Sequence, residues 1–156
     1  MLNNFITYEY DNIIPSDLSS NTILMIGRGE DKRKRFDLGI KAMKYIVDEI
    51  HDSKMKIIAD SRKLGNLKIL VKKLNLESKI KFVGYTSKPE IYFKNASLHI
   101  FPSSTEAFSL AFCETKIYGI PNIITGIDYF IETYKNFKLT NSFLNFFNPT
   151  INWTKE

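Results

Sequence analysis

The sequence predicts an α/β fold built on a doubly wound parallel sheet. Short apolar runs alternate with longer stretches in which apolar residues recur at helical spacing. At least five such runs occur, about one every 20 to 30 residues, which is typical of parallel strands joined by crossover helices. The chain has 156 residues, of which 44% are hydrophobic, so it can bury one proper core and is not expected to be disordered.

Five apolar runs are predicted to form the strands. They lie at residues 22–26, 54–59, 79–84, 97–101 and 122–125. The lone His99 in the fourth run is interpreted as a packing residue with no catalytic role.

Helices are predicted between these strands at residues 36–50, 66–76, 87–95 and 106–118. For the third helix, Ser87 is the expected N-cap and Glu90 completes a capping box. For the fourth, Gly119 occupies the position of a C-cap glycine and Pro121 prevents continuation.

The domain organisation expected from these patterns has three parts. Residues 1–21 form a leading segment or interdomain linker without periodic structure, and residues 22–129 form the α/β domain. Residues 130–156 carry aromatic side chains scattered among Asn and Thr and are left without an assigned fold. No internal repeat is present.

Composition limits the classes of function. The single cysteine, Cys113, excludes an internal disulfide and fits a reducing compartment. No apolar run has transmembrane length and no signal peptide is found, so we expect a cytoplasmic protein, with a peripheral position at a membrane surface as an alternative. The formal net charge of +5 suits an anionic partner: a nucleotide diphosphate, a nucleic acid or a lipid headgroup.

Two carboxylates stand out in the segment from residue 101 to 121, which reads as strand, loop, helix and stop. Glu106 lies at the expected start of the helix and Glu114 lies eight residues later. In a continuous helix they would be roughly 80° apart around the axis and about 12 Å apart along it. They would then face one groove without sharing a proton or a metal ion. Taken alone, each glutamate is ordinary for a helix terminus or a solvated helix face.

The whole string, E-A-F-S-L-x-x-x-E-x-x-x-x-G-x-P, resembles the signature of the family-4 retaining glycosyltransferases of GT-B fold, which is E-G-F-G-L-x-x-x-E-A-x-x-x-G-x-P. The matching positions are Glu106, Phe108, Leu110, Glu114, Gly119 and Pro121. Ala107 and Ser109 replace two glycines, and Thr115 replaces an alanine.

A basic loop after the first strand contains Arg28, Lys32, Arg33, Lys34 and Arg35. It resembles the G-R-L-x-x-x-K-G loop of the same family, in which an arginine and a lysine hold the donor diphosphate. Arg28 matches the arginine; Lys34 is the best match for the lysine, with Lys32 as the alternative, and Arg35 replaces the final glycine. Without the resemblance, the loop would be read as a solvated charge run or a nucleic-acid patch.

The resemblance implies a Rossmann-like half of a GT-B enzyme, the C-terminal half that binds the nucleotide-sugar donor. Arg28 and Lys34 would neutralise the diphosphate, Glu106 would contact the donor sugar near the reacting carbon, and Glu114 would bond the ribose hydroxyls. Backbone N–H groups of residues 108–110 would point at the donor. No metal ion or other cofactor is implied, because the family does not depend on one and no D-x-D motif occurs.

The resemblance leaves the acceptor open, whether glycan, lipid or protein, and implies that an acceptor-binding half or partner chain is needed for turnover. A second hypothesis is a degenerate, non-catalytic binding or scaffold domain of the same fold, suggested by the replaced glycines. Nucleic-acid binding ranks third, because the aromatic residues fall at core positions and are not interleaved with the basic ones.

Overall fold

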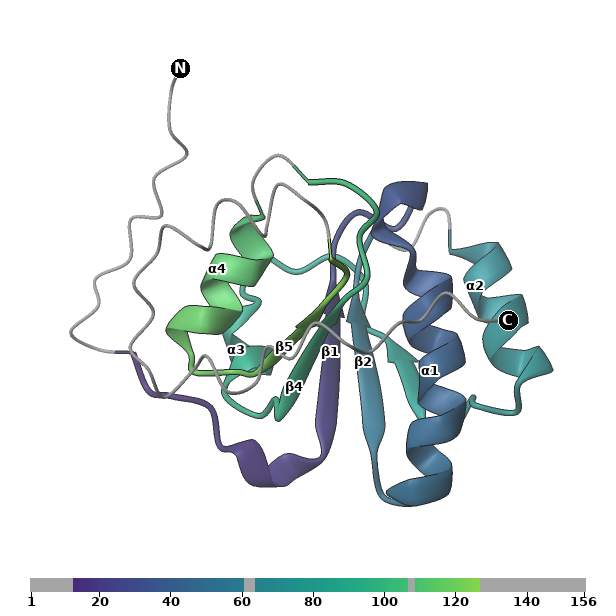
Figure 1. Cartoon of the computed structure of the whole chain (residues 1–156), viewed down its shortest axis with the longest axis horizontal. Helices are drawn as coiled ribbons and strands as arrows, with labels where there is room; N and C mark the ends of the chain where they lie inside the picture. The colour runs from purple at the N-terminus through teal and green to yellow at the C-terminus, as the bar shows by residue number, and fades with distance from the viewer. Residues whose placement is uncertain (1–12, 61–63, 107–108, 127–156) are drawn as a thin grey trace. The chain divides into compact units, whose positions relative to one another are not determined.

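The computed structural model describes residues 13–60, 64–106 and 109–126, all but Gly126 within the compact unit of residues 1–125. It confirms the predicted class: a five-stranded parallel sheet in the order β3-β2-β1-β4-β5 with helices on both faces (Figure 1). The strands are β1 (Thr22–Ile26), β2 (Lys54–Ile58), β3 (Ile80–Phe82), β4 (Leu98–Phe101) and β5 (Asn122–Ile124). The helices are α1 (Phe36–Glu49), α2 (Gly65–Lys73), α3 (Glu90–Phe93) and α4 (Leu110–Ile117), with short 3₁₀ turns η2 (Leu18–Ser20) and η3 (Lys32–Lys34).

Some sequence predictions concern residues outside the described ranges. These are the tail at residues 130–156, the first twelve residues of the leading segment, and positions 107 and 108, which include Phe108. The described end of the leading segment is not entirely irregular, because Asp17 caps η2 through its carboxylate.

Strand β1 is the centre of the sheet. It pairs with β2 over its full length, from Thr22↔Lys54 to Ile26↔Ile58, and with β4 at Ile23↔Leu98 and Leu24↔His99. Four of its five residues are buried, as expected of a central parallel strand covered on both faces. Strands β2 and β3 lie on one side of β1, and strands β4 and β5 lie on the other side. The direction in which the sheet grows therefore reverses between β1 and β4.

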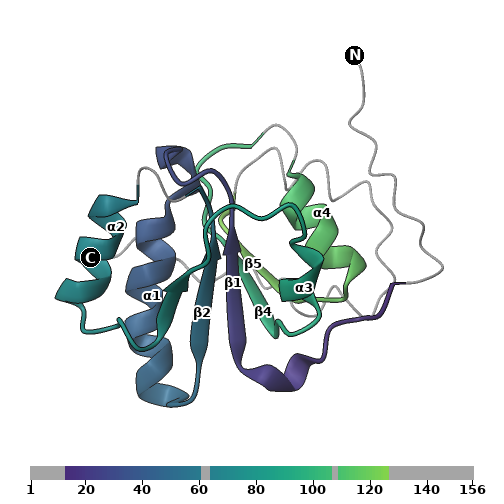
Figure 2. The same cartoon turned by 180° about the vertical axis from the view of Figure 1, so that it is seen from behind.

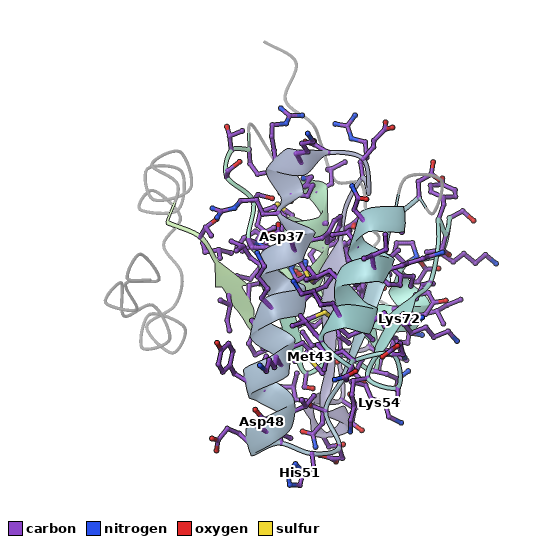
Figure 3. All side chains as sticks on the ribbon, turned by 90° about the vertical axis from the view of Figure 1, so that its right-hand side faces the viewer. Asp37, Met43, Asp48, His51, Lys54 and Lys72 are labelled. Carbon is purple, nitrogen blue, oxygen red and sulfur yellow. The ribbon has the colours of Figure 1, made fainter. Side chains whose placement is uncertain are left out.

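Two apolar layers cover the sheet. The first lies under α1 and α2 and is built around the buried Met25, Ile40, Met43, Met55 and Ile57. The second lies on the side of α3 and α4 and includes Leu24, Phe93, Ala96, Tyr118 and Ile120. Figure 3 views α1 and α2 from the outside, with Asp37 in the first turn of α1 and Asp48 near its end.

Helix α4 begins later than predicted. Its N-cap is Ser109, whose hydroxyl accepts a hydrogen bond from the Phe112 N–H at 3.2 Å, so the helix runs from Leu110 and not from Glu106. Glu106 therefore lies in the loop after β4, so the separation calculated for a continuous helix does not apply. The physical reason is the serine side chain, which satisfies a first-turn N–H group that would otherwise lack a partner.

The predicted stop of α4 is confirmed. Gly119 has φ of +71°, and its N–H donates to the Lys116 carbonyl at 2.9 Å, while the Ile120 N–H donates to the Thr115 carbonyl at 3.0 Å. This pair of bonds is a Schellman motif, in which glycine takes the left-handed position at no steric cost.

The predicted cap of α3 was wrong. Pro89 occupies the N-cap position and no side chain bonds the helix start. The hydroxyl that acts in this turn belongs to Thr86, which accepts from the Lys88 N–H at 3.1 Å. Helix α3 itself is a single turn, Glu90–Phe93.

Helix α1 packs on β1 through a glycine. A Cβ atom at Gly39 would lie 2.3 Å from the Sδ atom of Met25, whose side chain is fully buried. At Gly65, the first residue of α2, the same added atom would meet nothing within 4 Å. Both glycines are in helices, but only Gly39 lies where an added side chain would meet another residue.

We predict that Gly39→Ala lowers the free energy of unfolding by about 1–2 kcal/mol, because overpacking outweighs the gain in helix propensity. Gly65→Ala is the control and should be neutral or stabilising by up to about 1 kcal/mol. Urea unfolding followed by circular dichroism measures both. Equal effects of the two substitutions would show that the approach of α1 to Met25 is not tight.

A polar cluster lies inside the layer under α4. His99 is fully buried, and its Nδ1 lies 2.6 Å from Asn122 Oδ1. The Asn122 amide donates to the Ile120 carbonyl at 2.8 Å, so Oδ1 must accept and His99 Nδ1 must carry the proton. Thr115 Oγ1 lies 3.0 Å from the same Oδ1, while His99 Nε2 has no hydrogen-bond partner among the described residues.

Burial lowers the pKa of His99 to about 4. The hydrogen bond with Asn122 opposes this shift, and the positive charge of Lys34 adds a smaller effect in the same direction as burial.

We predict that acid destabilises the fold through His99. In the unfolded chain the imidazole takes up a proton below pH of about 6.5, whereas in the fold it does so only below about 4. Stability is therefore fully present above pH 6.5 and falls by roughly 3 kcal/mol as the pH drops to about 4. Denaturant unfolding across this range should show the loss in the native chain and in His51→Gln, where an exposed histidine is removed, but not in His99→Gln. An equally steep loss in His99→Gln would assign the effect to other groups.

Candidate functional site

The candidate site lies where the carboxyl ends of β1 and β4 meet. In an open parallel sheet, the loops on either side of the reversal in strand order diverge and leave a crevice for ligands. Here those loops are residues 27–35, after β1, and residues 102–109, after β4. Figure 1 shows both connections at the same end of the sheet.

The central contact of the site is an ion pair between Lys34 Nζ and Glu106 Oε1, from residues 72 positions apart. The side chains are 16% and 9% exposed, so both charges lie mostly out of water. The Lys34 stem packs on Gly27, where an added Cβ would approach it to 3.3 Å, and its ammonium lies 5.3 Å from the centroid of the Phe101 ring. The candidate site therefore contains one cation and one anion whose positions are fixed by these contacts.

A backbone bond also joins the two loops. The Ser104 N–H donates to the Arg33 carbonyl at 2.8 Å, so the loop after β4 is attached directly to η3. Thr125, after β5, adds a hydroxyl bond to the Ser103 carbonyl. These bonds fix the position of Glu106, which follows shortly in the same loop.

Asp31 and Arg33 form a second pair, which sequence analysis did not anticipate. The Asp31 carboxylate accepts from the Arg33 backbone N–H at 3.1 Å, from Nε at 2.9 Å and from Nη2 at 2.8 Å. The guanidinium bond is the main cause that lowers the pKa of Asp31, and the same bond raises the pKa of Arg33. An aspartate just before a run of four basic residues is the signal that indicates this cap. Arg33 is engaged within its own loop and is not directed at Glu106.

The backbone conformation of Arg35 supports Lys34, and not Lys32, as the match to the lysine of the family loop. Arg35 has φ of +46° and ψ of +44°, the left-handed conformation that glycine adopts freely and other residues adopt at a cost of roughly 1–2 kcal/mol. Arg35 thus takes the backbone shape expected of the glycine that it replaces in the resemblance. The lysine immediately before it, Lys34, is also the one that reaches Glu106, whereas Lys32 is exposed on η3.

The other predicted site residues take different positions. Arg28 is exposed on the loop after β1, where its carbonyl accepts from the Asp31 N–H at 3.1 Å. Ser109 is 5% exposed with its hydroxyl used as the helix cap, and the Leu110 side chain is 47% exposed. Glu114 is half-buried in the second turn of α4, about 6 Å along the helix axis from Leu110.

The charge of Glu114 acts on its own helix. The pKa of Tyr118 is raised, first by burial and then by the negative charges of Glu90 and Glu114. At the same helix, burial lowers the pKa of Lys116. Among the residues that the structure describes, no three His, Cys, Asp or Glu side chains gather as a ligand set for a metal ion.

Two further observations concern the described residues as a whole. No helix in them is both long and apolar enough to cross a bilayer. An open groove of about 530 Å³ runs along β2 and β3, away from the loops of the candidate site.

Comparison with known proteins identifies the family. The family described as "Glycosyl transferases group 1" matches residues 8–149 of the chain. An uncharacterized glycosyltransferase of Haemophilus influenzae is 28% identical over 123 residues, which cover 76% of this chain and 35% of the relative.

Two solved structures illustrate the likeness in fold. A TarM variant from S. aureus, in complex with Fondaparinux, alpha-GlcNAc-glycerol and UDP, has a TM-score of 0.70 at 23% identity over 81% of this chain and 25% of that chain. The C-terminal domain of LpcC, a group 1 family glycosyl transferase from Francisella tularensis, has a TM-score of 0.57 at 22% identity over 71% of this chain and 59% of that chain.

The chain spans 35% of the length of its Haemophilus relative. The family match nevertheless covers most of this chain, and the parallel sheet agrees with the architecture of the solved glycosyltransferases. The chain therefore belongs to the group 1 glycosyltransferases and has the Rossmann-like α/β fold of a GT-B domain.

Proposed function

We propose that this chain is the donor-binding half of a retaining glycosyltransferase, which takes a sugar from a nucleoside-diphosphate sugar and passes it to an acceptor held by a second half. The observation that carries the proposal is the meeting of Lys34 and Glu106 at the carboxyl ends of β1 and β4, where the strand order reverses. A cation for a diphosphate and an acceptor of hydrogen bonds from sugar hydroxyls are the two groups that such a donor requires.

Lys34 and Arg28 act on the leaving group. As the bond between the sugar and the diphosphate breaks, the electron pair stays with the diphosphate oxygen, and fixed positive charge stabilises it. Without donor, Lys34 is neutralised by Glu106. An incoming diphosphate competes for the ammonium, and this exchange leaves the Glu106 carboxylate available to the sugar.

Helix α4 supplies the remaining donor contacts in this proposal. Its first turn presents backbone N–H groups with the positive end of the helix dipole, which favours a phosphate. Glu114, in the next turn, accepts hydrogen bonds from the ribose hydroxyls. The acceptor, and the partner half that holds it, lie beyond this domain.

A non-catalytic domain of the same fold is the alternative. One specific observation favours it: Ser109, which replaces a glycine of the signature, is buried and uses its hydroxyl to cap α4. A serine side chain at this point occupies space that a glycine would leave to the donor. The alternative predicts a folded chain that binds no nucleotide sugar.

We predict that Lys34→Met weakens binding of UDP or GDP, whichever the chain prefers, on the order of 10- to 100-fold, because a charge-assisted contact to the diphosphate is lost. Isothermal titration calorimetry at low salt, first with both nucleotides and their sugar conjugates, provides the measurement. Lys41→Met is the matched control, because it removes a lysine that is also ion-paired, with Asp37 at 3.0 Å, on α1. Equal affinities of Lys34→Met and the native chain would remove Lys34 from the site, and no binding by a folded native chain would favour the alternative.

We predict that substitutions of Glu106 and Glu114 affect the binding of different ligands. Glu106→Gln should leave the affinity for the bare nucleotide diphosphate unchanged or raise it, because Lys34 is released. The same substitution should lower the affinity for the sugar conjugate. Glu114→Gln should weaken both by about 10-fold, because the ribose is common to them. The same titrations test this, and loss of bare-nucleotide binding in Glu106→Gln would contradict the assigned roles.

A further inference from the structure

Four lysines project from one face of β2 and β3. Lys54 and Lys56 alternate along β2 with Met55 and Ile57, which are fully buried on the other face in the layer under α1. Lys81 is opposite Lys56 in the strand register, and Lys79 precedes β3 with the same alternation about the buried Ile80. We call this set, Lys54, Lys56, Lys79 and Lys81, the lysine face.

The spacing of the lysine face concentrates positive charge. Neighbouring strands lie about 4.8 Å apart, and residues two positions apart along a strand lie about 6.6 Å apart. Lys56 and Lys81 are therefore a directly opposed like-charge pair, an arrangement that costs stability. Within the described residues, none of the four takes part in an ion pair: Lys56 lies 5.6 Å from the Tyr92 ring centroid, and Lys79 donates to the His51 carbonyl.

The groove along these strands has the same chemistry. Its volume is about 530 Å³, and five of its ten lining residues are lysines: the four of the lysine face and, from α2 on the other side of the sheet, Lys68. Glu77 is the one acidic side chain that lines it, and no arginine does.

Protection of a sheet edge does not account for the whole set. Lysines on an edge strand discourage pairing with other chains, which would explain Lys79 and Lys81. Strand β2 is interior, between β3 and β1, so Lys54 and Lys56 have no edge to protect. Figure 2 shows α3 and α4 toward the β4–β5 half of the sheet, and the lysine face lies over the other half.

We propose that the lysine face binds an anionic lipid surface. Lysines act as point charges suited to a diffuse layer of headgroups, whereas recognition of individual phosphates favours the arginine fork, which the groove lacks. Two exposed residues of types that a membrane interface accepts follow β3 in the chain: Tyr85, 82% exposed, and Ile91 of α3, 57% exposed. The inference is independent of donor binding, so either can fail alone.

The test is flotation of the chain with vesicles made of equal parts phosphatidylglycerol and phosphatidylcholine, compared with phosphatidylcholine alone, at low and high salt. The chain should bind only the vesicles that contain phosphatidylglycerol, and high salt should release it from them. Each lysine near such a surface contributes roughly fivefold, so Lys56→Gln/Lys81→Gln should weaken binding on the order of 25-fold. This variant should melt no lower than the native chain by circular dichroism, because it removes a like-charge pair.

The matched control is Lys41→Gln/Lys44→Gln, which removes the same charge from exposed positions on α1 and should bind the vesicles as the native chain does. Equal vesicle binding by the native chain and Lys56→Gln/Lys81→Gln would overturn the proposal. The proposal would also be overturned if the native chain bound a single-stranded oligonucleotide more tightly than the vesicles and Lys56→Gln/Lys81→Gln lost that binding. The partner of the lysine face would then be a soluble polyanion.

Discussion

The parallel pairing of β1 with β4 is the constraint on which the candidate site depends. It joins distant parts of the chain through two register pairs, and it brings the loops that follow both strands to one edge of the sheet. Lys34 and Glu106 meet because of this pairing, although nothing in their local sequence connects them. The pairing is itself secured by burial, because a strand that is apolar on both faces is stable only at the centre of a covered sheet.

Positive charge is placed at both ends of the sheet. Lys34 follows β1 at the carboxyl end, whereas Lys54 opens β2 and Lys79 precedes β3 at the amino end. A strand of five residues separates these ends by about 16 Å. The lysine at the carboxyl end of β1 and those at the amino ends of β2 and β3 therefore belong to separate regions of the sheet.

The strands, the fold class and the stop at Gly119 were predictable, because each depends on a local pattern of apolar, glycine and proline residues. The start of α4 was not, because composition permits a helix from Glu106 and one hydrogen bond at Ser109 selects a later start. The resemblance already favoured Lys34 over Lys32, but the contact of Lys34 with Glu106 depends on the pairing of distant strands, which local sequence patterns do not give. The lysine face depends on the register between β2 and β3, which sequence patterns do not give.

The contact between Gly39 and Met25 also limits how this domain can vary over evolutionary time. At this contact the end of the Met25 side chain occupies the space that a side chain at position 39 would need. Enlarging one residue is then acceptable only after the other has become smaller, so the two positions are expected to drift together. Substitutions in the centre of the domain are thereby coupled, while those at the open Gly65 are not.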